Sequence, residues 1–462
     1  MSIIQGILQI NSFYSGITTQ ILVDYNNISR PILDVMHAIF NSIFYLLLYI
    51  AAAISMVYIL IAIYSYFSGD LTKEKKFIPK KAPFVTIQIP TYNELAALSC
   101  AQRCLNFDYP KDKYEIIIGD DSNDPLVSAE IDNFAEKYAG RIKVTRRGNN
   151  EGFKPGNLKH MLKYSKGEIL VIFDSDFLPK EDFLKRIVTP FIYDKKISAV
   201  QARWSYLEQN KNLTSILSST ITTAFHYVSI PFAYKNSKVA VICGSAEAIR
   251  KKDLIKLGGW RVGSLTEDIE YSIRLLKNGK KVIYLDKLEC EGEVPSKPKD
   301  LFKQQMRWAY GVTESLKIHI KDIFKTKKIG FDEKFFILFF CSGYMFSFLL
   351  ALLFVTGTMS FLTNAPGPID LTKFFKETII NVVLTSGIVI SSLVALLKSK
   401  NAKQWLKMIV ASFSIGLIVT YYVNKGLFKL AMKKKVPWFM LEKKGNKMSS
   451  YSENMTLNSS EK

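Results

Sequence analysis

Long apolar stretches without charged residues lie near both ends of the chain, and a patterned polar region separates them. Asp, Glu, Lys and Arg are missing from residues 35–69, 335–369, 378–397 and 408–424. About 20 apolar residues suffice for a helix that crosses a bilayer. We therefore expect one transmembrane helix within 35–69 and two more within 335–397. The first stretch begins too far in and runs too long for a cleavable signal peptide.

Lysine clusters flank these stretches and orient them. Five lysines lie between residues 73 and 81, five between 317 and 328, and four between 398 and 407. Because positive charge accumulates on the cytoplasmic side of membrane proteins, we expect these clusters and the region 82–322 to be cytoplasmic. The N-terminal segment 1–34 is then extracytoplasmic.

The fourth apolar stretch does not fit this orientation as a simple crossing. It is short, and the lysines that follow it at 433–435 would then lie outside. We expect 404–432 to be a helical hairpin that returns to the cytoplasm, with a further transmembrane segment as the alternative. The basic and polar tail 433–462 is then cytoplasmic. The chain reads as a multi-pass membrane protein, with the plasma membrane as its expected location and the lipid bilayer as a partner.

The region between the apolar stretches has a different pattern. Short β-branched runs occupy 85–89, 114–118, 168–173, 239–242 and 281–285, and helical patterns lie near 94–105, 128–138, 156–164 and 181–191. Alternating strands and helices predict a mostly parallel sheet covered on both faces. In such sheets the ligand crevice lies beyond the carboxyl ends of the strands.

Composition excludes several classes of protein. The formal net charge is +21, but no nucleic-acid-binding motif accompanies it, so we assign the excess to the membrane surface and expect no nucleic acid as a partner. Five cysteines without a CxxC spacing indicate free thiols rather than a disulfide framework or a zinc site. The chain has no GxxxxGK[ST] and no GxGxxG motif, which argues against a P-loop ATPase or a dinucleotide dehydrogenase.

Polar clusters follow four of the predicted strands. They are Pro90-Thr-Tyr-Asn-Glu94, Gly119-Asp-Asp121, Asp174-Ser-Asp176 and Cys243-Gly-Ser245. Any one cluster is explained by helix capping. Their occurrence together at one edge of one sheet favours a ligand site.

Two acidic motifs carry candidate chemistry. Asp174 and Asp176 offer two hard oxygen ligands, which suit Mg²⁺ or Mn²⁺ carrying a diphosphate. Asp268 stands at the predicted start of a helix after Thr266 and Glu267. There it either favours the helix dipole or acts as a general base.

Basic and aromatic residues complete the candidate site. Gln304, Arg307 and Trp308 lie on one helix face at i, i+3 and i+4. The Arg fork suits phosphate oxygens and the indole suits the apolar face of a sugar, although an interfacial Arg/Trp pair beside a membrane explains the motif equally well. Lys154 lies in a Gly-bounded turn before a helix, where it could meet a phosphate.

In their order along the chain, these motifs resemble glycosyltransferase family 2 over about residues 82–310. The similarity is greatest to its membrane-bound cellulose, mannan and hyaluronan synthases. Val200-Gln-Ala-Arg-Trp204 and Gly258-Gly-Trp260 resemble the glucomannan synthase branch. The resemblance implies an α/β GT-A (Rossmann-like) glycosyltransferase domain plus transmembrane α-helices. It also implies inverting transfer from a UDP- or GDP-hexose to a growing β-linked polysaccharide.

The resemblance also implies roles for individual residues. Asp268 would be the catalytic base, and Asp174 and Asp176 would hold the Mg²⁺ or Mn²⁺. Nucleotide-sugar-binding residues would be Thr91, Tyr92, Glu94, Asp120, Asp121, Lys154, Gln304 and Arg307. Acceptor-binding residues would be Trp308, Cys243, Gly244, Ser245 and Glu267.

Other interpretations remain open at this stage. A glycolipid synthase that adds one sugar to a lipid acceptor would share these acidic and Arg-Trp motifs. A nucleotide-binding scaffold with an inactive site is disfavoured because the acidic motifs are intact. Trp438–Lys443 resembles the family's gating segment, but Leu441 stands where Thr is usual. A homo-oligomer or an accessory secretion subunit would be a further expected partner.

Overall fold

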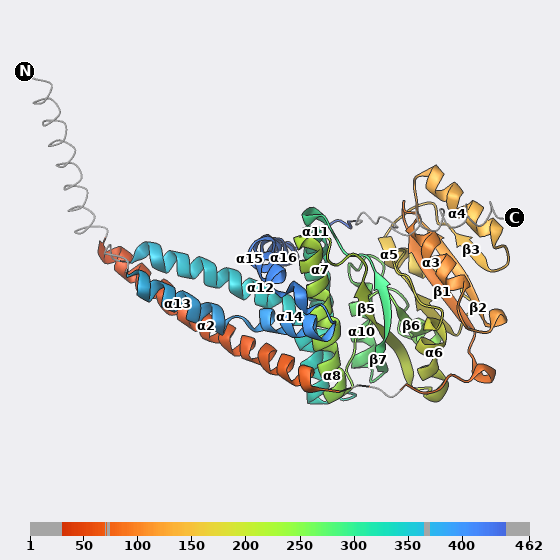
Figure 1. Cartoon of the computed structure of the whole chain (residues 1–462), viewed down its shortest axis with the longest axis horizontal. Helices are drawn as coiled ribbons and strands as arrows, with labels where there is room; N and C mark the ends of the chain where they lie inside the picture. The colour runs from red at the N-terminus through yellow and green to blue at the C-terminus, as the bar shows by residue number, and fades with distance from the viewer. Residues whose placement is uncertain (1–29, 70, 72–73, 365–369, 440–462) are drawn as a thin grey trace, which may run out of the picture. The chain divides into compact units, whose positions relative to one another are not determined.

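The structure, a computed structural model, describes residues 30–69, 71, 74–364 and 370–439 (Figure 1). Most of the predicted N-terminal segment, and Leu441 and Lys443, lie outside the described residues. The chain divides into two units. One comprises Met1–Tyr58 and Phe346–Ile388, and the other comprises Ile59–Met345 and Val389–Lys462.

A seven-stranded sheet forms the centre of the second unit (Figure 1). Its strands are β1 (Val85–Thr91), β2 (Tyr114–Asp120), β3 (Ile142–Thr145), β4 (Ile169–Ile172), β5 (Ile197–Tyr206), β6 (Glu247–Arg250) and β7 (Lys281–Gly292). Their order is β3-β2-β1-β4-β6-β5-β7. All pairs are parallel except those of β6, which runs antiparallel to β4 and β5. The prediction of a mostly parallel sheet is confirmed.

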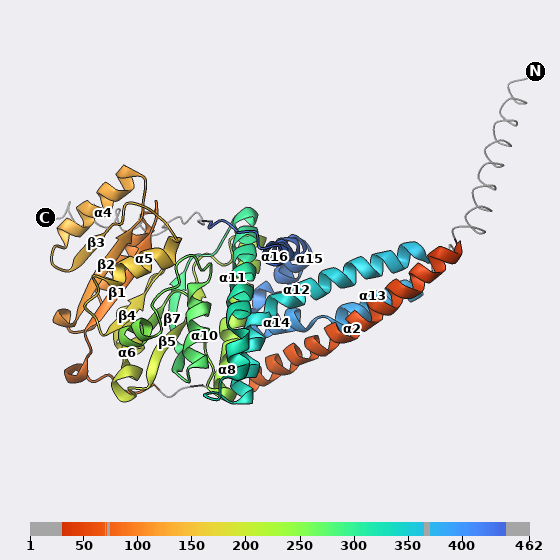
Figure 2. The ribbon, with the colours of Figure 1, turned by 180° about the vertical axis from the view of Figure 1, so that it is seen from behind.

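Helices cover both faces of this sheet (Figure 2). One face carries α3 (Ala96–Leu105), α4 (Pro125–Lys137) and α6 (Phe183–Tyr193), and the other carries α5 (Phe153–Leu162), α8 (Ile230–Ser237), α9 (Lys251–Lys256) and α10 (Glu267–Lys277). Successive β2 residues alternate between the two layers. Ile116 and Ile118 pack under α3 and α4, while Ile117 packs against α5. An apolar run therefore marks a strand that is buried on both faces.

The prediction of a strand at 239–242 is wrong. These four residues are almost fully buried but form no sheet pair. Side chains satisfy the local backbone instead, since Ile242 N donates to Ser272 Oγ at 2.9 Å and Cys243 N donates to Gln201 Oε1 at 2.7 Å. The strand lies a few residues later, as β6. The strands β3, β5 and β6 were not predicted from the pattern.

Several helices of the second unit complete its fold. They are α7 (Leu213–Ala224), a π-helical turn at Phe225–Ser229, α11 (Pro298–Lys325), α15 (Trp405–Phe413) and α16 (Ile415–Ala431), with 3-10 turns at Pro79–Lys81, Lys111–Lys113 and Ala402–Gln404. The helices α11 and α16 pack tightly. A Cβ atom on Gly426 would lie 2.7 Å from the backbone oxygen of Met306.

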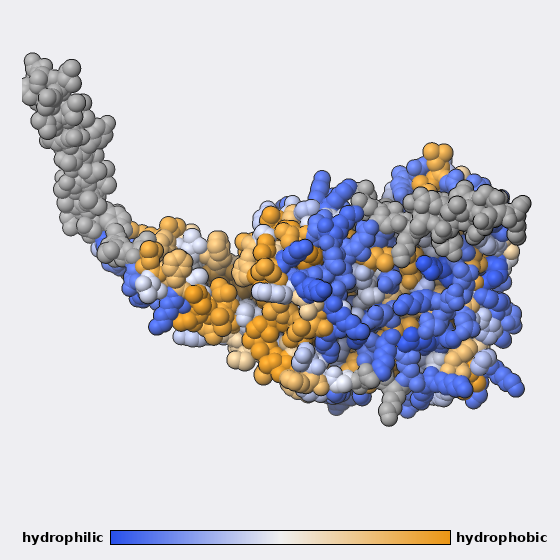
Figure 3. All heavy atoms as spheres, viewed as in Figure 1, coloured by the Kyte–Doolittle hydropathy of each residue, from blue (hydrophilic) through white to orange (hydrophobic). Residues whose placement is uncertain are grey.

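Two helices are long and apolar enough to cross a membrane. They are α2 (Arg30–Phe67) and α12 (Phe331–Thr363). Two bent pairs qualify if each is one span: α13 (Leu371–Leu384) with α14 (Gly387–Lys398), bent by 57°, and 402–413 with α16, bent by 54°. In the face shown in Figure 3, hydrophobic residues cover much of these helices, whereas the surface over the sheet domain is largely hydrophilic.

The first unit is a small helical assembly with its own core. Leu48 and Ala51 of α2 pack against Phe346 and Leu353 of α12. The backbone N–H of Gly387 donates to Ser55 Oγ at 2.7 Å. The α13–α14 bend therefore has a buried polar partner on α2.

Candidate active site

A cavity of about 450 Å³ lies beyond the carboxyl ends of β1, β2 and β4. Fourteen of the sequence-predicted site residues line it: Thr91, Tyr92, Glu94, Asp121, Lys154, Asp174, Asp176, Cys243, Gly244, Glu267, Asp268, Gln304, Arg307 and Trp308. Asp120 and Ser245 do not. The rule that ligands bind beyond the carboxyl ends of parallel strands therefore predicted the position of the cavity from the sequence.

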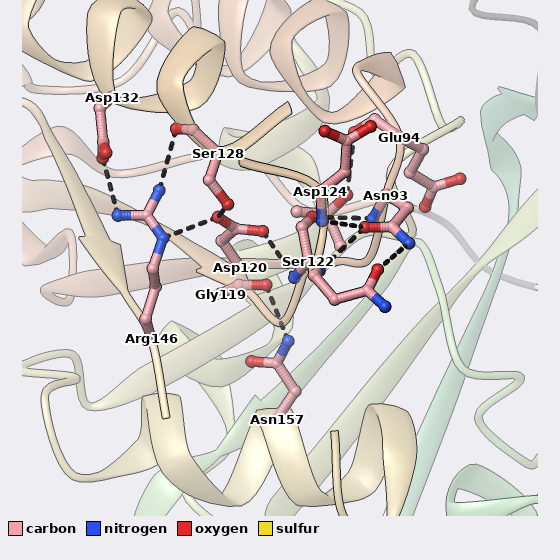
Figure 4. A network of polar contacts seen from close by, with 12 residues as sticks. Asn93, Glu94, Gly119, Asp120, Ser122, Asp124, Ser128, Asp132, Arg146 and Asn157 are labelled. Carbon is pink, nitrogen blue, oxygen red and sulfur yellow. Dashed lines mark hydrogen bonds and ion pairs between the residues drawn. The ribbon is translucent and has the colours of Figure 1, made fainter. Parts of the chain in front are cut away.

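Asp120 does not line the cavity and instead belongs to a polar network with Ser122, Ser128 and Arg146 (Figure 4). Its carboxylate accepts hydrogen bonds from Ser122 N at 2.9 Å, Ser128 Oγ at 2.8 Å and Arg146 Nε at 2.8 Å. Burial opposes its charge, but these hydrogen bonds outweigh that effect and hold its pKa below the ordinary value. In this structure Asp120 ties the end of β2 to α4, which suits a structural role better than nucleotide contact.

Asp121, the next residue, lines the cavity and is held by Arg147. The guanidinium forks onto the carboxylate, with Nε 2.9 Å from Oδ1 and Nη2 2.6 Å from Oδ2. The same guanidinium also donates to the backbone oxygen of Phe153 at 3.1 Å. Sequence reasoning missed Arg147 because it follows β3, a strand that the pattern did not reveal.

The Asp174-Ser-Asp176 motif follows β4 and presents both carboxylates to the cavity. Asp174 N donates to Ser245 Oγ at 2.9 Å, and Asp176 Oδ2 accepts from Glu293 N at 3.1 Å. The hydroxyl of Ser175 points the other way and donates to Glu94. These contacts fix the turn and the direction of each acidic side chain.

The acidic lining fits a divalent cation bound together with a diphosphate. Among the described residues around the cavity, seven are Asp or Glu and two are Lys or Arg. Within the described part of the chain, no three His, Cys, Asp or Glu side chains converge as a complete metal cage. Asp174 and Asp176 would supply two hard oxygen ligands to such an ion, and diphosphate oxygens and water would suit the remaining positions.

Lys154 joins the acidic groups of the cavity. Its Nζ lies 2.6 Å from Asp174 Oδ1, 3.3 Å from Glu267 Oε1 and 2.6 Å from the backbone oxygen of Gly244. Burial opposes the positive charge, but Asp174 and Glu267 outweigh it and raise the pKa of Lys154 above its ordinary value. The ammonium group is therefore charged at neutral pH. It stands in the first turn of α5, which begins at Phe153, rather than in a turn before the helix.

Asp268 lies in the first turn of α10 and is the best candidate for a general base. Burial, reinforced by the neighbouring Glu267, raises its pKa to about 7, and Lys154 and Arg307 counter this only in part. A base with a pKa near the working pH transfers protons efficiently. The helix-dipole role alone does not account for a carboxylate enclosed in the cavity.

Gly244 fits closely against this base. Its φ is 88°, a value that side chains rarely adopt. A Cβ atom at Gly244 would lie 3.2 Å from Asp268 Oδ2 and 3.3 Å from Lys154 Nζ. Its N–H donates to Glu247 Oε2 at 2.7 Å. Burial raises the pKa of Glu247 well above its ordinary value, and no sequence signal singled this residue out.

The helix α11 brings Gln304, Arg307 and Trp308 to the cavity together. Arg307 Nη1 donates to the backbone oxygen of Leu265 at 3.0 Å, and the guanidinium carbon lies 4.4 Å from the centre of the Trp438 ring. Burial lowers the pKa of Arg307, and Glu267 and Asp268 oppose that shift.

The segment after α16 returns to the cavity. Trp438 stacks on Phe153 of α5 with ring centres 5.4 Å apart and an interplanar angle of 15°. Trp438 and Phe439 both line the cavity. The aromatic start of the segment that resembles the family's gating motif therefore lies where a bound ligand would meet it.

Other lining residues were not assigned a role from the sequence. They are Pro90, Asn150, Phe153, Asn157, Phe177, Trp204, Tyr206, Ser218, Thr222, Leu265, Thr266, Glu293, Val294 and Pro295. Most are apolar or uncharged and come from segments that are distant in sequence. Single-sequence motifs cannot indicate that such residues meet.

Comparisons with known proteins agree with this geometry. Residues 82–311 match the family described as glycosyltransferase like family 2. Probable glucomannan 4-beta-mannosyltransferase 11 of Oryza sativa subsp. japonica is 31% identical over 268 residues, which cover 54% of this chain and 45% of that protein. Glucomannan 4-beta-mannosyltransferase 2 of Arabidopsis thaliana is 30% identical over 266 residues, which cover 56% of this chain and 49% of that protein. The aligned region thus spans about half the length of these relatives.

A solved structure shares the fold. A mannosyltransferase from Pyrobaculum calidifontis, in complex with GDP-Man and Mn²⁺, superposes with a TM-score of 0.59 at 17% identity over 87% of this chain and all of that one. The GT-A prediction is confirmed. Through its domain at residues 82–311, with the acidic and Arg-Trp motifs in one cavity, the chain belongs to glycosyltransferase family 2.

Proposed function

We propose that this protein is an inverting membrane glycosyltransferase that moves mannose from GDP-mannose to a growing β-linked polysaccharide. One observation carries the proposal. Asp268, whose pKa is raised to about 7, shares a single cavity with the Asp174/Asp176 pair, Lys154 and Arg307. A base beside a diphosphate site is the arrangement that in-line glycosyl transfer requires.

The residues would divide the reaction between them. The acceptor hydroxyl gives its proton to Asp268 as its oxygen attacks the anomeric carbon of the donor. The bond from that carbon to the diphosphate oxygen breaks on the opposite side, which inverts the configuration. Lys154 and Arg307 stabilise the charge that develops on the departing diphosphate.

Asp174 and Asp176 would hold a divalent cation, Mg²⁺ or Mn²⁺, on the donor. When bound, such an ion supplies Lewis-acid stabilisation of the diphosphate. The mannosyltransferase of similar fold was solved with Mn²⁺, which supports this assignment. Lys154 now contacts Asp174 and would share that carboxylate with the ion.

The choice of donor rests on the relatives and on Asp121. The relatives are named as glucomannan mannosyltransferases, and the protein of similar fold was solved with GDP-Man. Asp121 lies on the cavity with its carboxylate oriented by Arg147. A carboxylate suits the two adjacent N–H donors of guanine, whereas uracil offers only one.

The membrane setting is part of the proposal. We infer that the catalytic domain faces the cytoplasm, where nucleotide sugars are made, and that the apolar helices hold it at the bilayer. The lysine clusters at 73–81, 317–328 and 398–407 support this orientation.

Transfer by the purified full-length protein tests the function. The protein in detergent, with Mn²⁺ and labelled GDP-mannose, is expected to give a product that β-mannanase digests, and UDP-glucose is expected to give less. Asp268→Asn should lower transfer by at least about 10²-fold, because the base is lost. The exposed Asp112→Asn is the matched control and should behave as wild type. A single labelled sugar on a lipid would instead establish the glycolipid synthase, and equal transfer by Asp268→Asn would refute the mechanism.

A further inference from the structure

One part of the cavity lining comes from β5 and α7, and the sequence motifs assign it no role. Trp204 and Tyr206 lie on β5, and Ser218 and Thr222 lie on α7. We propose that these residues form an acceptor subsite, in which the Trp204 indole stacks on the sugar ring next to the reacting one. This inference rests on the proposed function and extends it to the recognition of the acceptor chain.

Three neighbours hold the Trp204 side chain in one orientation. Its Nε1 donates to the backbone oxygen of Ser245 at 2.9 Å. His226 stacks on it with ring centres 5.1 Å apart and an interplanar angle of 26°, and Phe177 meets it edge-on at 5.1 Å and 62°. These contacts leave part of the indole on the cavity, which Trp204 lines.

The aromatic support is electrically neutral. Burial, together with the nearby Arg203, lowers the pKa of His226 to about 3. The imidazole is therefore uncharged at any working pH. An apolar, rigid ring surface suits the C–H face of a hexose, which needs no charge for stacking.

Trp204 is also connected to the proposed base, Asp268, through the loop of Gly244 and Ser245. Ser245 holds the indole through its backbone oxygen, and the preceding residue, Gly244, lies against Asp268. Consecutive Cα atoms are about 3.8 Å apart, so one short loop touches both the base and the aromatic platform. A sugar whose hydroxyl reaches Asp268 would place its neighbouring ring close to this platform.

The lining also offers polar atoms that a sugar could satisfy. Among the described residues, the buried Gln304 Oε1 has no hydrogen-bond partner, and the buried Tyr206 hydroxyl interacts with Thr222. Both residues line the cavity. Buried polar groups are nearly always hydrogen-bonded, and sugar hydroxyls both donate and accept. A polyhydroxyl ligand would therefore supply a partner for Gln304 Oε1 that the protein itself does not.

A purely structural role for Trp204 explains less. Trp204 packs at the edge of the sheet core, and its N–H tethers Ser245. Core packing accounts for the contacts with His226 and Phe177. It does not account for the position of the indole on the cavity.

Acceptor kinetics with the full-length protein test the subsite. We expect Trp204→Leu to raise the KM for a β-mannotetraose acceptor by about tenfold, while the KM for GDP-mannose stays within about twofold of wild type. Trp204→Phe keeps an aromatic ring and should recover most of the affinity. Tyr206→Phe removes only the hydroxyl and should raise the acceptor KM severalfold.

A matched tryptophan and a stability measurement separate binding from folding. Trp405 on α15 is 52% exposed and does not line the cavity, so Trp405→Leu should leave both KM values unchanged. The inference is overturned if Trp204→Leu keeps the wild-type acceptor KM. It is also overturned if Trp204→Phe and Trp204→Leu lose donor binding, acceptor binding and thermal stability in parallel.

Equilibrium binding keeps this test independent of the proposed function. Absence of transfer from GDP-mannose by wild type would refute the donor assignment alone. Calorimetric titration of wild type and Trp204→Leu with β-mannotetraose, in the presence of GDP and Mn²⁺, would still decide the subsite. Weaker binding by Trp204→Leu supports it, and equal binding, or no binding to wild type, refutes it.

Discussion

Asp268 lies among charges of both signs, and its reactivity depends on their balance. Burial and Glu267 raise its pKa, while Lys154 and Arg307 lower it, and the result is about 7. A base must be deprotonated to accept a proton. The kcat/KM for transfer is therefore expected to be low in acid, to rise through about pH 7 and to level off above it.

Glu267 provides a direct test of this balance. Glu267→Gln removes a neighbouring negative charge, so the pKa of Asp268 should fall and the acidic limb of the profile should move to lower pH. The measurement is kcat/KM against pH for wild type and variant. An unmoved limb would mean that another group controls it.

The two aspartates after β4, Asp174 and Asp176, should affect the metal dependence of transfer rather than its pH dependence. Asp174→Asn and Asp176→Asn should both abolish metal-dependent transfer without unfolding the protein, because each removes one anionic ligand. Titration of activity with Mn²⁺, beside a thermal melt, measures the effect. Near-native activity of either variant at ordinary metal concentration would remove that residue from the metal site.

Some residues of the candidate site could be predicted from a single sequence, and others could not. Asp174, Asp176, Asp268 and Lys154 were predicted because each belongs to a short motif next to a strand or helix start. Arg147, which binds the carboxylate of Asp121, was not predicted. Arg147 reaches back 26 residues to Asp121, and no local pattern encodes such a pairing.

At the scale of elements, the strands with runs of Ile and Val were found, whereas β3, β5 and β6 were not. The strands β1, β2 and β4 are almost wholly buried and are rich in Ile and Val, which made them recognisable. The strand β6 begins with Glu247 and ends with Arg250, and its four residues carry too little periodicity to be recognised. A strand was predicted instead at the neighbouring apolar segment 239–242. That segment is buried but unpaired, which shows that burial alone does not determine sheet pairing.

Packing between α11 and α16 depends on a glycine. A Cβ atom at Gly426 would lie 2.7 Å from the Met306 backbone oxygen, which cannot move without its helix. Gly426→Ala should therefore destabilise the protein by about 1–3 kcal/mol, as overpacking does. Transfer should fall as well, because α11 carries Gln304 and Arg307.

Gly416 on the same helix provides the control. Its Cβ would meet only ordinary contacts, 3.6 Å from the Ala411 backbone oxygen at the closest. Alanine also favours helix over glycine by about 1 kcal/mol. Thermal melts should then show a lower Tm for Gly426→Ala and an equal or higher Tm for Gly416→Ala. The same Tm for both variants would contradict this account of the contact.

At the scale of the whole molecule, the path of the chain through the bilayer depends on the two bent helix pairs. Length and composition give two spanning helices, or up to four if each bent pair crosses. Charge favours a hairpin over a fourth crossing, because α16 is followed by Lys433, Lys434 and Lys435. The 54° bend between 402–413 and α16 is compatible with a helical hairpin.

The hairpin hypothesis predicts that the end of α16 is cytoplasmic. Lys434 is exposed and follows α16, so Lys434→Cys in a cysteine-free background offers a site for a membrane-impermeant maleimide. We expect no labelling in intact cells and full labelling after permeabilisation. Lys80→Cys, in the lysine cluster after α2, should behave in the same way, because both positions follow the positive-inside rule.

A site on the opposite side completes the test. Asp370, between α12 and α13, is exposed and is expected to be extracytoplasmic, so Asp370→Cys should label in intact cells. If Lys434→Cys labels like Asp370→Cys, then α16 completes a fourth crossing. That outcome would place Trp438 outside, where it could not stack on Phe153 of the cavity that we propose to be cytoplasmic. The observed stack therefore ties the topology of α16 to the catalytic site, and both should agree on a cytoplasmic end.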